Sequence, residues 1–149
     1  MQWKKICCAV DFSELSRLAQ DQAAELARRY EADLVLVHVY DVPKLTSSGM
    51  VRPEQVAETV RELQRKLEAW RREAEFLAGR PVEAKALSGD PAEEILRFAR
   101  EGFVELIVLG THGRSGLRRL VLGSVAERVV RQAECPVLVT RHMISLRSD

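Results

Sequence analysis

Glycine is concentrated in one segment of the chain, GTHGRSGLRRLVLGS, over residues 110–124. Gly110 and Gly113 carry no Cβ, so the backbone can turn sharply there, with positive φ angles open to it. Amide N–H groups in such a turn converge on anions. Gly123 and Ser124, separated from Gly113 by nine residues, stand at the expected start of a helix, where free amides and the helix dipole attract phosphate. The spacing predicts a phosphate-binding segment, although each glycine pair alone is equally typical of a turn or a helix cap.

Two common phosphate-binding fingerprints do not fit this segment. A Walker A loop requires G-x-x-x-x-G-K-[ST], and none of these glycines is followed by that pattern. A G-x-G-x-x-G dinucleotide loop is also absent, because His112 occupies the position of its second glycine. The pattern that fits is G-x2-G-x9-G-[ST], which indicates a different class of nucleotide site.

Short apolar runs alternate with longer amphipathic runs along the chain. Strands are expected over residues 4–10, 33–39, 82–87, 104–109 and 136–140. Helices are expected over residues 13–30, 53–78, from Asp90 onward and from Gly123 onward. This alternation predicts one α/β domain over residues 1–149, with an open five-stranded parallel sheet and helices on both faces, a Rossmann-like fold.

The helix expected over 53–78 has apolar residues at strict four-three spacing, namely Val56, Val60, Leu63, Leu67, Trp70, Ala74 and Leu77. Such a stripe suits a coiled coil or a helix that covers a sheet, and its length favours the sheet-covering role. The connection over 40–52 is rich in turn formers, and it is interpreted as a flexible connector or as a flap over a site.

Ligands of parallel α/β sheets bind beyond the carboxyl ends of the strands, where the strand order reverses. Asp11 follows the first expected strand, Val39 ends the second, and Gly110 follows the fourth. We therefore expect these residues to share one site, although Asp11 also suits a cap of the next helix. His38 lies inside an apolar strand, and we expect it to be a buried histidine with a partner rather than a ligand.

Composition limits the classes of protein that remain. The 149 residues are 46% hydrophobic and 30% charged, as in soluble globular proteins, and a net charge of +1 disfavours a nucleic-acid binder. No apolar run approaches the ~20 residues of a membrane span, and no signal peptide is recognisable, so we expect a cytoplasmic protein without membrane partners. Cys7, Cys8 and Cys135 fit a reducing compartment, and we expect them to be buried, with Cys7 and Cys8 on opposite faces of their strand.

The segments AVDFSE, LVLVHV, LIVLGTHGRSG, VLGSVAERVV and CPVLVTR resemble the universal stress protein family, in its ATP-binding branch. The likeness covers nearly the whole chain and implies that ATP, with Mg or Mn, binds between the ends of the first, second and fourth strands. It implies that Asp11 lies near the ribose and metal, that the main chain of Val39 reads the adenine edge, and that the glycine segment receives the phosphates. The implied site residues are Ala9, Asp11, Val39, Gly110, His112, Gly113, Arg114, Ser115, Gly116, Gly123, Ser124 and Val125. Ala9 departs from a proline that is frequent in relatives.

The family also pairs its subunits through the last strand. This implies a homodimer through Val137, Leu138 and Val139, and an apolar strand at a sheet edge invites such pairing. The resemblance implies a regulatory, stress-response dimer whose nucleotide modulates its conformation or choice of partner. Two alternatives remain: slow ATP hydrolysis or autophosphorylation, for which no general base is obvious, and a dimeric adaptor that needs no nucleotide.

Overall fold

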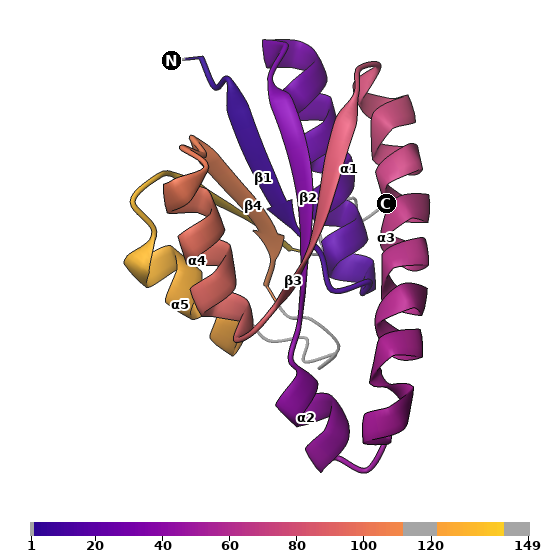
Figure 1. The fold of residues 1–149 in the computed structure, drawn as a ribbon. Coiled ribbons are helices and arrows are strands. Elements are labelled where there is room, and N and C mark those ends of the chain that lie inside the picture. The colour runs from indigo at the N-terminus through magenta and orange to yellow at the C-terminus, as the bar shows by residue number, and fades with distance from the viewer. Residues whose placement is uncertain (1, 112–121, 142–149) are drawn as a thin grey trace, which may run out of the picture.

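A five-stranded parallel sheet in the order β3-β2-β1-β4-β5 forms the centre of the structure, a computed structural model that describes residues 2–111 and 122–141 (Figure 1). Its strands are β1 (Lys5–Ala9), β2 (Asp33–Tyr40), β3 (Val82–Ser88), β4 (Leu106–Gly110) and β5 (Val137–Thr140). The expected α/β class is confirmed, and each expected strand is present within two residues of its predicted bounds.

Helices cover both faces of this sheet. The helices of the described residues are α1 (Glu14–Tyr30), α2 (Val42–Ser47), α3 (Val56–Ala78), α4 (Pro91–Glu101) and α5 (Ser124–Gln132), with a short 3₁₀ turn, η1 (Pro53–Gln55), before α3. In Figure 1, α1 and α3 lie against one face, whereas α4 and α5 lie against the other. Two apolar clusters fill the layers between the sheet and these two pairs of helices.

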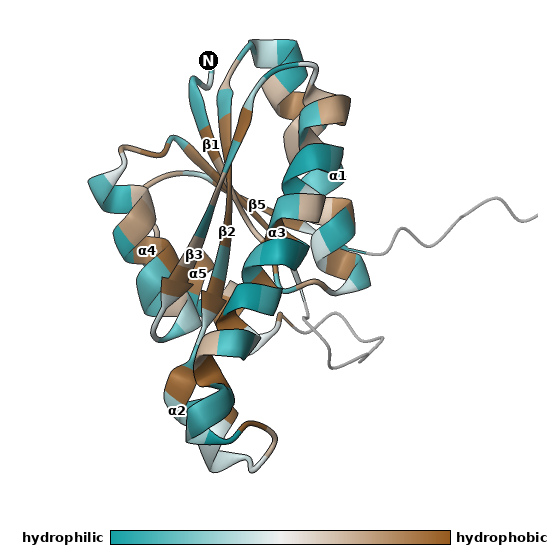
Figure 2. Ribbon diagram, turned by 45° about the vertical axis from the view of Figure 1, so that its right-hand side comes forward, coloured by the Kyte–Doolittle hydropathy of each residue, from teal (hydrophilic) through white to brown (hydrophobic). Residues whose placement is uncertain are grey.

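The central strands supply both clusters because successive side chains of a strand point to opposite faces. Cys7 belongs to the cluster under α4 and α5, while Cys8 belongs to the cluster under α1 and α3. Both cysteines are fully buried, as expected, whereas Cys135 is only partly buried. In Figure 2 the strands are coloured mainly as hydrophobic, and the outer surfaces of α1 and α3 are mainly hydrophilic.

The long helix α3 covers the sheet, as its apolar stripe predicted. It packs against α1 and β3, and Leu67, Trp70 and Ala74 are buried in the cluster on that face. The stripe is imperfect at its end, because Leu77 is 44% exposed and Ala78 is buried in its place.

The connection over 40–52 is not the irregular segment that its composition suggested. It contains α2, whose first turn is capped by Asp41, since Oδ1 of that residue accepts a hydrogen bond of 3.2 Å from Lys44 N. Pro43, in the first turn of α2, also favours a helix start. Asp41 and Pro43 were the local signal for this helix, and six residues are too few for a periodic apolar pattern to reveal it.

Among the helices of the described residues, none combines the length and apolar character needed to cross a membrane.

Candidate functional site

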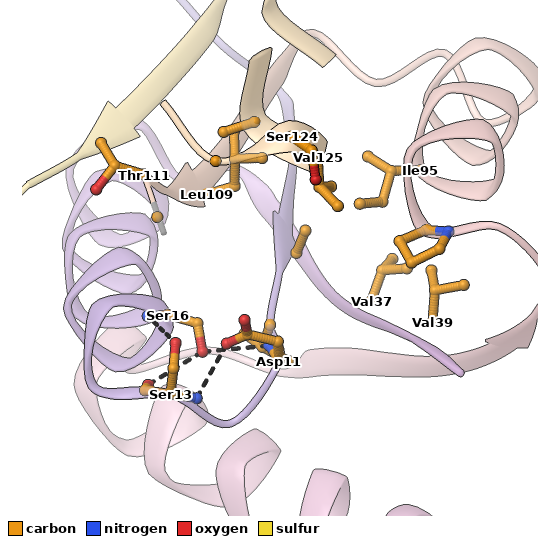
Figure 3. A pocket seen from close by; sticks show the side chains of 16 residues that line it. Asp11, Ser13, Ser16, Val37, Val39, Ile95, Leu109, Thr111, Ser124 and Val125 are labelled. Carbon is orange, nitrogen blue, oxygen red and sulfur yellow. Dashed lines mark hydrogen bonds between the residues drawn. The ribbon is translucent and has the colours of Figure 1, made fainter. Parts of the chain in front are cut away.

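A cavity of about 310 Å³ lies at the carboxyl ends of β1, β2 and β4 (Figure 3). β1 and β4 are neighbours in the sheet, but the helices that follow them, α1 and α5, cover opposite faces. The cavity therefore lies where the strand order reverses, the usual ligand position of such sheets, and its volume is within the ~300–1,000 Å³ of small-molecule pockets.

Residues that the sequence singled out surround this cavity. Those that line it are Ala9, Asp11, Val39, Gly110, Gly123, Ser124 and Val125. The remaining five, His112, Gly113, Arg114, Ser115 and Gly116, lie outside the described residues. The structure thus brings together three strand ends and one helix start, and a role of these residues in binding stays a prediction.

Further lining residues come from helix starts that the sequence reasoning did not assign to the site. They are Ser13 and Ser16 of the α1 start and Pro91 and Ile95 of α4. In a parallel α/β sheet every helix that follows a strand starts at the carboxyl edge. The N-caps Ser13 and Asp90 were therefore a usable signal, but only the strand order places α4 beside β1 and β4.

Asp11 is held in a network of hydrogen bonds at the α1 start. Its Oδ1 accepts from Ser13 N at 3.0 Å, and its own N–H donates to Ser16 Oγ at 3.2 Å. The first turn is closed by Ser16 N, which donates to Ser13 Oγ at 3.2 Å. Asp11 therefore binds its own local backbone and also lines the cavity, into which its carboxylate points in Figure 3.

The start of α5 presents main-chain N–H groups to the cavity. Gly123 is its N-cap and has no side chain with which to bind them, unlike the caps Ser13 of α1 and Asp90 of α4. The N–H of Gly123 itself donates to Thr111 O. Residues 124–126 line the cavity, and the first amides of a helix have no partner within it, so the positive end of α5 faces this space.

Gly110 is needed for a reason other than the one its sequence suggested. It is the last residue of β4 and does not have a positive φ, so the left-handed conformation that is open to a glycine is not used there. A Cβ on Gly110 would lie 3.0 Å from Leu15 Cβ and 3.1 Å from Leu15 C. The glycine allows α1 to approach β4 closely.

Apolar side chains form one wall of the cavity: Val37, Val39, Ile95, Leu109 and Val125. On the β1 side of β2, Val37 O accepts from Val10 N at 2.9 Å. Main-chain groups alternate along a strand, so the N–H and C=O of Val39 face the same side, beyond the end of β1. The wall thus combines an apolar surface with a main-chain donor and acceptor, which suits a flat, heteroaromatic ring.

His38 lies on the opposite face of β2 from this wall. It is 8% exposed, and its Nδ1 is 2.9 Å from Val10 O. The expectation of a buried histidine with a partner is confirmed. Within residues 2–111 and 122–141, no three His, Cys, Asp or Glu side chains gather in a way that would hold a metal ion.

Comparisons with known proteins agree with the fold and identify the family of the chain. The model of the universal stress protein family matches residues 2–141. The universal stress protein MJ0531 of Methanocaldococcus jannaschii is 34% identical, with 93% of this chain and 82% of that protein covered. The solved structure of MJ0577 from the same organism superposes with a TM-score of 0.83 at 30% identity, covering 97% of this chain and all of that one.

Adenine nucleotides are present in solved structures of similar proteins. The universal stress protein from Archaeoglobus fulgidus, in complex with dAMP, superposes with a TM-score of 0.69 at 25% identity and covers 95% of this chain and 100% of that chain. The match of the family model over nearly the whole chain, the similarity to curated relatives and the shared fold lead to one conclusion. The chain belongs to the universal stress protein family.

Proposed function

We propose that the protein binds ATP in this cavity and acts as a regulatory, stress-response dimer. The observation that carries the proposal is the combination, in one cavity, of an apolar wall, a carboxylate and an uncapped helix start. These three features match the base, the ribose and the phosphates of a nucleotide. The dAMP complex of the related Archaeoglobus fulgidus protein supports an adenine nucleotide as the ligand class.

Each part of the nucleotide has a chemically suitable partner. The adenine edge carries a donor and an acceptor, which complement the N–H and C=O of Val39 beside the apolar wall. The Asp11 carboxylate accepts hydrogen bonds from ribose hydroxyls. The phosphates bind the first amides of α5 and the Ser124 hydroxyl, where the helix dipole favours negative charge.

A divalent cation fits this arrangement as a companion of the phosphates. Mg²⁺ is usually held by one or two carboxylates together with substrate phosphates, rather than by a cage of protein groups. Asp11 is the one carboxylate among the described lining residues. Bound Mg²⁺ or Mn²⁺ would supply charge neutralisation, with Asp11 as its protein ligand.

Binding ranks ahead of hydrolysis in this proposal. A hydrolytic site needs a group that accepts a proton from the attacking water, and this group is most often histidine or a second carboxylate. Among the described lining residues there is no histidine and no carboxylate other than Asp11. Asp11 already accepts a hydrogen bond from Ser13 N.

The dimer would form through β5. This strand lies at one edge of the sheet. Pro136 O and Thr140 O accept hydrogen bonds from β4 and the residue after it, so the main-chain groups of Val137 and Val139 point away from β4. A second copy can pair with those groups and cover the partly exposed Leu138.

The test is to denature the purified protein and identify the small molecules it releases, together with calorimetric titration of ATP. We expect an adenine nucleotide in the released fraction or measurable ATP binding by the emptied protein. The absence of both results would overturn the proposal.

Gly123→Val tests the placement of the phosphates. The φ of −62° and ψ of 159° at Gly123 are accessible to valine, so we expect a folded protein whose added side chain fills the space at the α5 start and abolishes ATP binding. Ala57→Val, on the exposed surface of α3, is the control and should bind ATP normally. Unchanged affinity in a folded Gly123→Val variant would contradict the placement.

A further inference from the structure

Phe12 has a backbone conformation that residues with a side chain rarely adopt. Its φ is 66°, in the left-handed region that favours glycine. Among the other described non-glycine residues, only Glu31 and Phe103 have positive φ values, and both follow the last turn of a helix. The left-handed conformation is common at helix ends, whereas Phe12 lies between β1 and α1, directly after Asp11.

The surrounding structure holds the Phe12 ring in place. The ring centroid lies 4.4 Å from that of His38 and 5.2 Å from that of Trp70, with the latter pair edge to face. The ammonium group of Lys66 lies 5.0 Å from the centroid of the Phe12 ring. Contacts with β2 and α3 therefore stabilise a conformation that is strained on its own.

Trp70 is itself restrained by α1. Gln20 Nε2 donates to Trp70 O at 3.1 Å, and the guanidinium carbon of Arg17 lies 4.1 Å from the Trp70 ring centroid. The aromatic contact of Phe12 is thus part of the packing between α1 and α3, on the face of the sheet that carries those two helices.

Phe12 does not line the cavity, but the residues on either side of it do. Asp11 and Ser13 are lining residues, and Ser13 N donates to Asp11 Oδ1 across the Phe12 residue at 3.0 Å. The left-handed conformation of Phe12 turns the chain so that this hydrogen bond can close. Rotation of the Phe12 backbone would break it and release the carboxylate.

We propose that Phe12 is a positioning residue for nucleotide binding: its anchored ring holds the left-handed turn that directs the Asp11 carboxylate into the cavity. This inference rests on the proposed function, because it assigns Asp11 to the ribose hydroxyls of the ligand. Holding the carboxylate in place before binding raises affinity, since no ordering cost remains when the nucleotide enters.

A double-mutant cycle tests the inference. ATP affinity is measured by calorimetry for the unmodified chain, Asp11→Asn, Phe12→Leu and the double variant. We expect Phe12→Leu to weaken affinity about tenfold, the loss that follows when a hydrogen bond to a charged group is misaligned. Asp11→Asn should weaken affinity at least as much, and the double variant should bind no more weakly than Asp11→Asn, because Phe12 acts through Asp11.

Two further variants separate positioning from general stability. Tyr30→Leu removes a ring from the edge-to-face pair with Trp3, whose centroids are 5.3 Å apart, in the same apolar cluster. We expect Tyr30→Leu to lower the free energy of unfolding and to leave ATP affinity within about twofold. Phe12→Gly removes the backbone strain together with the ring, so it should fold and still bind ATP as weakly as Phe12→Leu.

Unchanged ATP affinity in folded Phe12→Leu or Phe12→Gly would overturn the inference. Independent losses that multiply in the double variant would overturn it too, as would an equal loss in Tyr30→Leu. Failure of the unmodified chain to bind ATP is a separate result, which removes the proposed function and this assignment together.

Discussion

At the scale of single residues, a glycine is needed at position 110 because Leu15 packs closely against it, and not because its φ is unusual. The glycine hydrogen leaves room for the backbone of Leu15, so the first turn of α1 lies directly on the end of β4. The same contact positions the start of α1, which lines the cavity through Ser13 and Ser16.

Gly110→Ala should therefore destabilise the protein. Its Cβ would lie 3.0 Å from Leu15 Cβ and 3.1 Å from a backbone carbon, so α1 must shift, at a cost of about 1–3 kcal/mol. Urea denaturation measures the change in the free energy of unfolding. Gly79→Asn is the control, because its φ of 64° suits asparagine and no atom lies within 4 Å of an added Cβ. Equal denaturation midpoints for Gly110→Ala and the unmodified chain would contradict the explanation.

Because of the buried Cys7 thiol, we expect the free energy of unfolding to fall at alkaline pH. Burial, together with the nearby Cys135, raises the pKa of the Cys7 thiol from its ordinary value of 9.0 to about 12. The unfolded chain loses this proton near pH 9, while the folded chain keeps it. The contribution to stability is therefore complete below pH 9 and is lost as the pH rises toward 12.

The comparison of the unmodified chain with Cys7→Ala isolates this effect from the titration of other groups. Above pH 9, in the presence of a reductant, the free energy of unfolding should fall more steeply for the unmodified chain than for Cys7→Ala. The difference between the two slopes should be up to about 1.4 kcal/mol per pH unit. Urea denaturation at several pH values between 8 and 11 measures both slopes. Parallel profiles for the two proteins would show that the buried thiol does not contribute.

At the scale of elements, the residue that caps α4 also forms an ion pair with α5. Asp90 caps α4, since its Oδ2 accepts from Glu93 N at 3.0 Å, and the same oxygen accepts from Arg128 Nη1 of α5 at 2.9 Å. Pro91 at the first position of α4 and Ser124 at the start of α5 both line the cavity. The ion pair thus joins the start of α4 to the middle of α5, next to the site.

The capping hydrogen bond of Asp90 should contribute more to the free energy of unfolding than its ion pair with Arg128. Asp90→Ala removes both interactions and should lower the free energy of unfolding by about 1–2 kcal/mol, the usual cost of losing an N-cap. Arg128→Ala keeps the cap and removes the partly exposed ion pairs of Arg128 with Asp90 and Glu93, so it should cost less than about 1 kcal/mol. Urea denaturation of both variants measures the two losses of free energy of unfolding. A larger loss in Arg128→Ala than in Asp90→Ala would show that the ion pair, rather than the cap, is the main contribution.

At the scale of the whole molecule, the edge strand is connected to the cavity by hydrogen bonds. Thr140 O accepts from Thr111 N at 3.1 Å, and Thr111 O accepts from Gly123 N. The hydroxyl of Thr140, which is 3% exposed, also donates to Leu15 O at 3.3 Å. A partner that binds along β5 would therefore contact a strand that is bonded to the starts of both α1 and α5.

Val139→Pro tests the proposed dimer. Val139 directs its N–H away from β4, so proline removes a donor from the free edge and keeps the β4–β5 ladder. We expect the unmodified chain to sediment as a dimer and Val139→Pro to sediment as a folded monomer. Val139→Ala, which retains the N–H, should remain a dimer. A Val139→Pro protein that sediments like the unmodified chain would exclude pairing through this edge.

The alternation of strands and helices could be predicted from local patterns in the sequence. So could five of the lining residues, Asp11, Val39, Gly110, Gly123 and Ser124, whereas Ala9 and Val125 were implied only by the family resemblance. The carboxyl ends of parallel strands meet at one edge of the sheet, so Asp11, Val39 and Gly110 could each be recognised as site residues from their position at the end of an apolar run. Ile95 was not recognisable, because an isoleucine on the inner side of a helix has the same pattern whether it packs in the core or lines a cavity. Helix α2 was missed because six residues carry too little periodicity.

The sequence by itself determined the class of the fold, its strands and longer helices, and the edge of the sheet at which the cavity lies, because these depend on periodicity and on residues close together in the chain. Only the tertiary structure decided which elements meet around the cavity and why Gly110 is required, because both depend on the order of the strands and on the close approach of α1. It also decided the conformation of Phe12. The strain of its positive φ is offset by contacts with His38, Lys66 and Trp70, which are distant in sequence, and no local pattern reports such contacts.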